Sequence, residues 1–232
     1  MRQFLLNWVD ALAPWTGFQG GWYWDDLGVF RRILQGQRPK CAWRYSPTRI
    51  PDRKRDCAYL HMLFDAALKK VGAVPEFCME CYKVVVYPRD LADVGAIENW
   101  QQNGEAAGWA CKVGADRRPY TNHFWGAYFY CRGLEEARSR YAKVAAWVDE
   151  NLGDDVEVII KRGCTEYENV FHDSEQWRTT DQSLKIEAEA EMVIDPGDSP
   201  CIQPDVLGFD TYHVWREHAA AIDRETVTYH DE

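Results

Sequence analysis

The stretch KVVVY at residues 83–87 decides the fold together with VEVIIK at residues 156–161. Both are rich in β-branched residues, which favour strands, and Pro88 stops the first one. Residues 109–113 and 123–130 have the same character and are separated by a polar connection, which predicts a β-hairpin. We therefore expect four strands between residues 83 and 161.

Two helices are predicted between these strands. Asp90 is a good N-cap for a helix that closes at Asn103-Gly104. Residues 134–152 form the clearest amphipathic pattern in the chain, and Gly153 lies just past its end. The resulting order is strand, helix, strand, strand, helix, strand, which is the ferredoxin-like βαββαβ arrangement. The predicted fold class is α+β, with this core at residues 82–162.

The remaining residues are expected to extend this core at both ends. The N-terminal extension, residues 1–81, should be helical, aromatic and basic. In it we expect helices at residues 3–13, from residue 25 or 26 to 34, and from 56 to 72. The C-terminal extension, residues 163–232, should be acidic and irregular, with a strand or helix at 183–194 and a helix at 211–222. The three regions are expected to pack as one compact domain.

Charge is distributed unevenly along the chain. The net charge is −10, yet residues 31–70 contain eleven basic and three acidic side chains, a local charge of +8 that leaves −18 on the rest. Such a segment can bind an anionic small molecule or a nucleic acid, or it can pair with the acidic C-terminal tail of the same molecule. The candidate substrate-binding residues are Arg44, Arg49, Arg53 and Arg55.

Four of the eight cysteines are predicted to form a metal site. Cys78 and Cys81 have the two-residue spacing of zinc knuckles and iron–sulfur sites. If the last strand lies beside the first, Cys164, which follows VEVIIK, approaches this pair. Cys57 is the fourth candidate, at the start of a helix. A pair joined by isolated thiols favours an iron–sulfur cluster of the 4Fe–4S type, with zinc as the alternative.

Three other residues are candidates for catalysis. Arg162 and Glu166 flank Cys164 and can serve as an anion clamp or a general base, or they can be solvent-facing charges at a strand end. His61 lies one helical turn after Cys57, so it is a substitute ligand or a proton donor.

The other four cysteines are not among the four predicted ligands, although Cys41 is a reserve candidate for the metal site. Cys111 and Cys131 should lie near each other across the hairpin, where packing as small hydrophobic side chains is favoured. Cys41 and Cys201 are left unassigned.

These patterns support three functional hypotheses. The first is a cysteine-ligated metalloprotein, favoured as an enzyme of unknown reaction acting on an anionic substrate. The second is a non-catalytic binding or assembly module with structural zinc or buried thiols. The third is a thiol-nucleophile enzyme that uses Cys57 with His61 as its base.

The composition excludes two broad classes of protein. An apolar fraction of 46% is too high for a wholly disordered chain. No run of 18 apolar residues is present, so we expect no membrane span and a cytoplasmic location. The sequence leaves the oligomeric state open.

Overall fold

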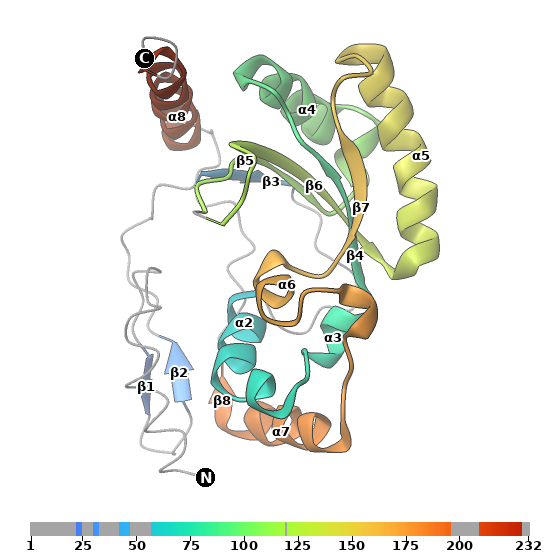
Figure 1. Cartoon of the computed structure of the whole chain (residues 1–232), viewed down its shortest axis with the longest axis vertical. Helices are drawn as coiled ribbons and strands as arrows, with labels where there is room; N and C mark the ends of the chain where they lie inside the picture. Colours follow the sequence, from blue (N-terminus) through green and yellow to red (C-terminus); the bar gives the residue numbers. More distant parts are fainter. Residues whose placement is uncertain are drawn as a thin grey trace. The chain divides into compact units, whose positions relative to one another are not determined.

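The computed structural model describes residues 22–24, 30–32, 42–46, 57–118, 120–195 and 209–228 (Figure 1). The chain divides into two compact units. Unit 1 is assembled from residues 1–39, 52–80 and 162–200, and unit 2 from residues 40–51, 81–161 and 201–232. Both units are therefore discontinuous in sequence.

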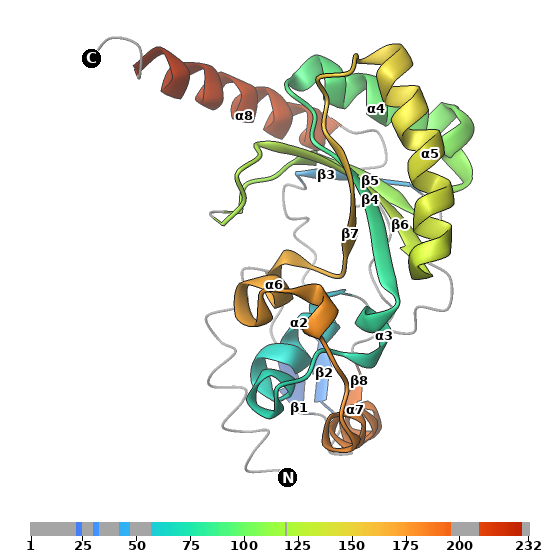
Figure 2. The same ribbon diagram turned by 45° about the vertical axis from the view of Figure 1, so that its right-hand side comes forward.

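Unit 2 is built on a five-stranded antiparallel sheet with the strand order β3-β5-β6-β4-β7. The strands are β3 (Trp43–Tyr45), β4 (Cys81–Val86), β5 (Cys111–Ala115), β6 (Trp125–Arg132) and β7 (Val158–Arg162). Helix α4 (Leu91–Asn103) follows β4 and helix α5 (Gly133–Asn151) follows β6. Both helices cover the same side of the sheet (Figure 2). The protein is thus a mixed helix-and-strand structure.

The predicted order of strands and helices between residues 82 and 162 matches these elements. The Asp90 side chain caps α4 by accepting hydrogen bonds from the backbone N–H groups of Ala92 and Asp93, at 2.9 and 3.0 Å. Strand β7 lies beside β4, as expected from the strand order. Strand β3 is an additional edge strand that the sequence did not predict.

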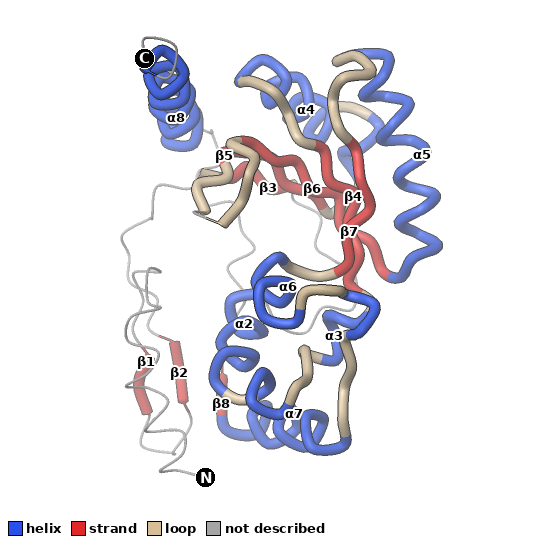
Figure 3. The backbone as a smooth tube through the Cα atoms, in the orientation of Figure 1, coloured by secondary structure: helices blue, strands red, loops and turns tan. Residues whose placement is uncertain are grey.

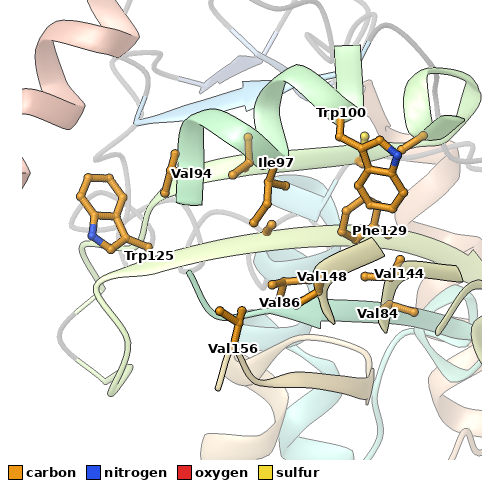
Figure 4. Close-up of a cluster of buried hydrophobic side chains, with 14 of the residues drawn as sticks. Val84, Val86, Val94, Ile97, Trp100, Trp125, Phe129, Val144, Val148 and Val156 are labelled. Carbon is orange, nitrogen blue, oxygen red and sulfur yellow. The ribbon is translucent and has the colours of Figure 1, made fainter. Parts of the chain in front are cut away.

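The core of unit 2 lies between the sheet and the two helices (Figure 4). Val84 and Val86 of β4 face the same side as Phe129 of β6, and all three are fully buried. Trp100 of α4 stacks on Trp147 of α5 with ring centroids 4.4 Å apart. Alternate residues of each strand therefore enter this core, and the residues between them face the opposite side of the sheet.

Helix α8 (Phe209–Thr228) is longer than the predicted helix at 211–222. Its Trp215 is buried in the core of unit 2, and the indole Nε1 donates a hydrogen bond to the carbonyl of Ala42 at 2.8 Å. Among the described helices, none combines the length and the apolar character needed to cross a lipid bilayer.

The hairpin of β5 and β6 places Cys111 and Cys131 on neighbouring strands but not opposite each other. Cys111 pairs with Phe129, so Cys131 is offset by two residues. Both thiols are free and buried, and burial raises each pKa to about 11. They are packed as small hydrophobic side chains, which is the favoured prediction.

Unit 1 is mainly helical and has its own core. Its helices are α2 (Cys57–Ala66), α3 (Glu76–Met79), α6 (Thr165–Phe171) and α7 (Asp181–Val193), drawn as neighbouring segments in Figure 3. A 3-10 helix, Leu68–Val71, follows α2 and ends at Gly72 with φ +68°, as predicted. Tyr167 of α6, Phe64 of α2 and Trp177 are central residues of this core.

One local prediction in unit 1 needs correction, and another cannot be compared with the described residues. The expected helix from residue 25 or 26 to 34 is wrong at β2 (Phe30–Arg32), which pairs antiparallel with β1 (Trp22–Trp24) and parallel with β8 (Ile194–Asp195). Pairing between distant segments overrides a weak local helical pattern here. The predicted helix at residues 3–13 lies outside the described residues.

The sequence pattern at residues 183–194 fits a strand or a helix, and in the structure this segment is helix α7 followed by β8. Thr180 and Ser183 bond reciprocally at its start: the Ser183 N–H donates to Thr180 Oγ1 at 3.0 Å and the Thr180 N–H to Ser183 Oγ at 2.8 Å. Two backbone donors are satisfied in this way, as in a capping box, which favours the helix.

Candidate metal centre

The end of β7 is tied to the segment between Cys78 and Cys81 by Arg162. Its Nε donates a hydrogen bond to the carbonyl of Met79 at 2.9 Å, and its Nη1 donates to the carbonyl of Ser174 at 2.8 Å. The predicted approach of Cys164 to the Cys78 segment is therefore present. These bonds also show that the Arg162 guanidinium holds three chain segments together.

A tight turn at Gly163 presents Cys164. Gly163 has φ +57°, in the left-handed region that favours glycine, and the ring of Trp177 packs directly against it. The turn connects β7 to α6, so Cys164 is the N-cap residue of α6 and Glu166 lies in its first turn. The positions of Cys164 and Glu166 are thus both set by the short segment that follows the Gly163 turn.

Three potential metal ligands meet at this turn. His61 of α2, Cys164 and Glu166 each offer one ligand atom, and these atoms all lie within 4.8 Å of one another. All three residues are half-buried. Imidazole nitrogen, thiolate sulfur and carboxylate oxygen are the three side-chain donors that zinc uses in proteins. We call His61, Cys164 and Glu166 the donor triad.

Tyr167 lies behind the donor triad and is fully buried. Its ring makes edge-to-face contacts with His61 and Trp177, at centroid distances of 5.3 and 5.7 Å. The Cys78 Sγ lies 3.5 Å from its hydroxyl oxygen, within hydrogen-bond distance. Tyr167 therefore orients one side of the His61 ring and connects Cys78 to the site.

The pKa of the Tyr167 hydroxyl is raised by burial and by nearby thiols. Burial raises this pKa well above its ordinary value, and the charges of Cys78, Cys164 and Cys57 raise it further. Three of the four cysteines predicted as ligands therefore act on the pKa of this hydroxyl group, and Cys78 lies within hydrogen-bond distance of it. In the described chain, however, the set of ligand atoms within 4.8 Å of one another contains only one of them, Cys164.

The fourth predicted ligand, Cys81, is the first residue of β4 and belongs to unit 2. It is buried, and its charge contributes to the raised pKa of Cys131. Cys57 opens α2, one turn before His61, so the two residues share a helix face.

Of the predicted substrate-binding arginines, the structure describes Arg44. Its side chain is 10% exposed, and its Nε forms an ion pair with Glu98 of α4 at 3.2 Å. This contact is intramolecular, but its partner lies in α4 and not in the acidic C-terminal tail that the alternative names. Arg49, Arg53 and Arg55 lie outside the described residues, as do Cys41 and Cys201.

Sequence reasoning missed Tyr167 and gave Glu166 and His61 only secondary roles. The available signal was the spacing of KRGCTEYE at residues 161–168, in which Cys164, Glu166 and Tyr167 follow a glycine turn. No protein-family model matches the chain, and no curated protein sequence matches it.

Glu187 of α7 supports the helix that carries Cys78 and leads to a pH-dependent prediction. Its carboxylate accepts a hydrogen bond from the N–H of Glu76, at 3.0 Å, at the start of α3. Burial and the charges of Glu76 and Glu191 raise its pKa from 4.5 to about 7. A raised pKa means that the folded state favours the protonated form of this carboxyl group. The stability that the group contributes to the protein is therefore lost as the pH rises from 4.5 to 7.

Glu187→Gln should therefore stabilise the protein at pH 8 by about 1 kcal/mol, a value reduced for partial solvent exposure, and leave it unchanged at pH 4. Urea unfolding at both pH values measures the difference. Glu189→Gln, on the same helix, is the charge-matched control and should show no such pH dependence. An equal effect of Glu187→Gln at both pH values would contradict the assignment.

Proposed function

We propose that this protein binds a metal ion through the donor triad, His61, Cys164 and Glu166. The proposal rests on one observation, the meeting of three different donor atoms within 4.8 Å from two helices far apart in sequence. The mixed nitrogen, sulfur and oxygen set suits zinc better than an iron–sulfur cluster, which is held mainly by thiolates.

Three protein ligands are typical of catalytic zinc sites, whereas structural sites usually have four. The number of ligands in the donor triad therefore supports a catalytic role, and so an enzyme. Bound zinc would polarise a water molecule or a substrate oxygen and lower the pKa of that water. The chain's own residues fix the ligands: Tyr167 packs against the His61 ring, and the Gly163 turn sets the direction of Cys164 and Glu166.

An iron–sulfur cluster held by Cys57, Cys78, Cys81 and Cys164 is the second candidate. It is supported by Cys78, which lies 3.5 Å from the hydroxyl of Tyr167, and by the effect of the Cys164 and Cys57 charges on the pKa of the same hydroxyl. In this alternative His61 and Glu166 would lie beside the cluster and would not be ligands.

We also propose that residues 81–162 adopt a ferredoxin-like arrangement. Its support is the strand order β5-β6-β4-β7, in which the first and last strands of the βαββαβ unit are neighbours, with a helix after the first and third strands. Strand β3 would then be an addition at the free edge.

Metal analysis and absorption spectroscopy of protein purified aerobically and anaerobically test the two candidates. We expect one zinc per chain and no absorption band near 400 nm. Glu166→Gln should weaken zinc binding by about 100-fold or more, since even residues that only orient ligands change affinity by 10- to 100-fold. Competition with a chromogenic chelator measures this affinity.

Two variants separate the outcomes of this experiment. Glu168→Gln, on the same helix, removes an equal charge and should leave zinc affinity unchanged, and so should Cys81→Ser. A brown protein whose iron is lost in Cys81→Ser would support the cluster in place of zinc. Protein that contains neither metal in either preparation, and that binds no added zinc, would overturn both candidates.

A further inference from the structure

We propose that the donor triad is regulated by oxidation, through a disulfide that joins Cys164 to Cys78 and removes the thiolate from the metal. This inference rests on the proposed function, because it concerns the regulation of the same site, and it gives Cys78 a role that metal binding does not. In the described chain, Cys78 is not one of the residues whose ligand atoms lie within 4.8 Å of one another.

A hydrogen bond brings together the segments that carry the two cysteines. Arg162 stands two residues before Cys164. Its Nε donates a hydrogen bond at 2.9 Å to the carbonyl of Met79, which directly follows Cys78. Cys78 belongs to the buried core of unit 1, and Cys164 packs against the same core. The two cysteines therefore lie in the same part of unit 1 although they are far apart in the sequence.

Tyr167 is a shared neighbour of the two cysteines. The Cys78 Sγ lies 3.5 Å from its hydroxyl oxygen, and its backbone N–H donates a hydrogen bond to the carbonyl of Cys164 at 3.0 Å. The charge of Cys164 raises the pKa of this hydroxyl more than the charge of Cys57 does. Because the interaction between charges weakens with distance, Cys164 is the better placed of these two thiols to reach Cys78.

The exposure of the two thiols assigns them different roles. Both are free, Cys164 is half-buried, and Cys78 is 4% exposed. A small oxidant in solution therefore meets Cys164 first. As a metal ligand Cys164 is held as the thiolate, which is the form of cysteine that reacts with peroxides. Cys78 is shielded by the core from direct attack, so it is the thiol that reacts second.

The oxidant that we name is hydrogen peroxide, and two steps form the disulfide. In the first, the Cys164 thiolate attacks one peroxide oxygen, the O–O bond breaks, a sulfenic acid forms and hydroxide leaves. In the second, the Cys78 sulfur attacks the sulfur of that sulfenic acid, the S–O bond breaks, and the Cys78 proton leaves with the hydroxyl group as water. The two sulfur atoms together lose the two electrons that the peroxide gains.

The disulfide changes the contacts of both residues. Its sulfur atoms are about 2 Å apart, so the Cys78 side chain turns from the Tyr167 hydroxyl toward Cys164. Cys164 then has no thiolate to offer, and of the donor triad only His61 and Glu166 remain. Zinc sites in proteins use at least three protein ligands, so the metal is released. Reduction by a dithiol restores the thiolate and with it the site.

Mass spectrometry of the unmodified, metal-free protein tests the disulfide. Chelator-treated protein is exposed to hydrogen peroxide at pH 8, its remaining thiols are alkylated, and it is digested. Trypsin places three thiols in different peptides: Cys164 in 163–178, Cys78 in 71–83 and Cys57 in 56–69. A glutamate-specific protease then cuts after Glu80 and separates Cys78 from Cys81. We expect the fragment with Cys164 to be linked to the fragment with Cys78.

Release of zinc measures the regulatory effect. Zinc-loaded protein is treated with hydrogen peroxide in the presence of a chromogenic chelator. We expect about one zinc to be released for each disulfide formed, with zinc affinity lowered by about 100-fold or more. A dithiol added afterwards, once the peroxide has been removed, should restore zinc binding.

Two serine variants compare Cys78 with the other thiol of its peptide. In Cys78→Ser the sulfenic acid of Cys164 is not resolved, so repeated exposure should add two oxygen atoms to the peptide 163–178, and the dithiol should no longer restore zinc binding. Cys81→Ser should form the disulfide and regain zinc as the unmodified protein does. Thermal unfolding confirms that each variant is folded. The peptide map of the unmodified protein locates the disulfide even if Cys78→Ser does not fold.

Three results would overturn the inference: oxidation of Cys164 without a link, a link to Cys57 or Cys81 in place of Cys78, or zinc that stays bound after the disulfide has formed. None of these results affects the proposed function, because zinc binding by the reduced protein is measured separately. If the reduced protein binds no zinc but forms the disulfide, the proposed function fails, and the release of metal fails with it.

Discussion

Replacement of Gly163 by alanine is expected to lower the free energy of unfolding by about 3 kcal/mol or more and to abolish high-affinity metal binding. Gly163 has φ +57°, and a Cβ atom added there would lie 2.3 Å from Cζ3 of Trp177. Both the backbone conformation and the contact are unfavourable for alanine. The indole is 5% exposed in the core of unit 1, so it cannot move aside without loss of packing.

Urea unfolding and zinc competition measure the two effects of Gly163→Ala. Gly95→Ala is the control for the same chemical change: Gly95 lies within α4, and a Cβ atom there meets nothing within 4 Å. This variant should stabilise the protein by about 0.5–1 kcal/mol, because alanine is the better helix former. If Gly163→Ala were as stable as Gly95→Ala and kept its zinc, the role of the turn would be refuted.

Arg118→Met is expected to destabilise the protein by about 2–3 kcal/mol at pH 7. Arg118 Nη2 lies 2.6 Å from Asp116 Oδ2, and the Asp116 side chain is 3% exposed. Burial alone would raise the pKa of Asp116, but the hydrogen bonds and charge of Arg118 outweigh it and hold that pKa below its ordinary value. Without Arg118, an ionised carboxylate would stay buried beside the hydroxyl of Tyr128.

The pH dependence of Arg118→Met identifies this mechanism. A depressed pKa contributes stability above the unfolded pKa, and this stability is lost as the pH falls through the folded value. The difference between the variant and the unmodified protein should therefore be full above the ordinary aspartate pKa of 3.8 and shrink as the pH falls below it. In the double variant Asp116→Asn, Arg118→Met, the loss at pH 7 should be smaller than in Arg118→Met alone. A pH-independent loss would point to packing in place of charge.

The parts of the fold that sequence could predict are those set by local chemistry. Asp90 caps α4 through its own side chain, and Gly72 and Gly153 end helical segments in the left-handed region. KVVVY and VEVIIK form strands because β-branched residues favour them. By contrast, β2 pairs with β8, which lies far away in the sequence at residues 194–195, as well as with the nearby β1.

The donor triad was predictable only in part for the same reason. The spacing of Cys78 and Cys81 is a local signal, and it predicts a metal site whose ligands are thiols. The meeting of His61 with Glu166 depends on how α6 packs against α2, which no local pattern encodes. Cys78 contacts Tyr167, and nothing in the local sequence distinguishes this tyrosine from the other aromatic residues of the chain.

The discontinuity of unit 1 has a consequence for protein synthesis. His61 leaves the ribosome before all of residues 81–161, whereas Cys164 and Glu166 follow them. At ordinary elongation rates these 81 intervening residues take roughly 4 to 16 s. During that interval the nascent chain carries α2 and α3 without the partners that complete their core. If the proposed metal site is correct, its three ligands can therefore meet only after the whole of residues 81–161 has been made.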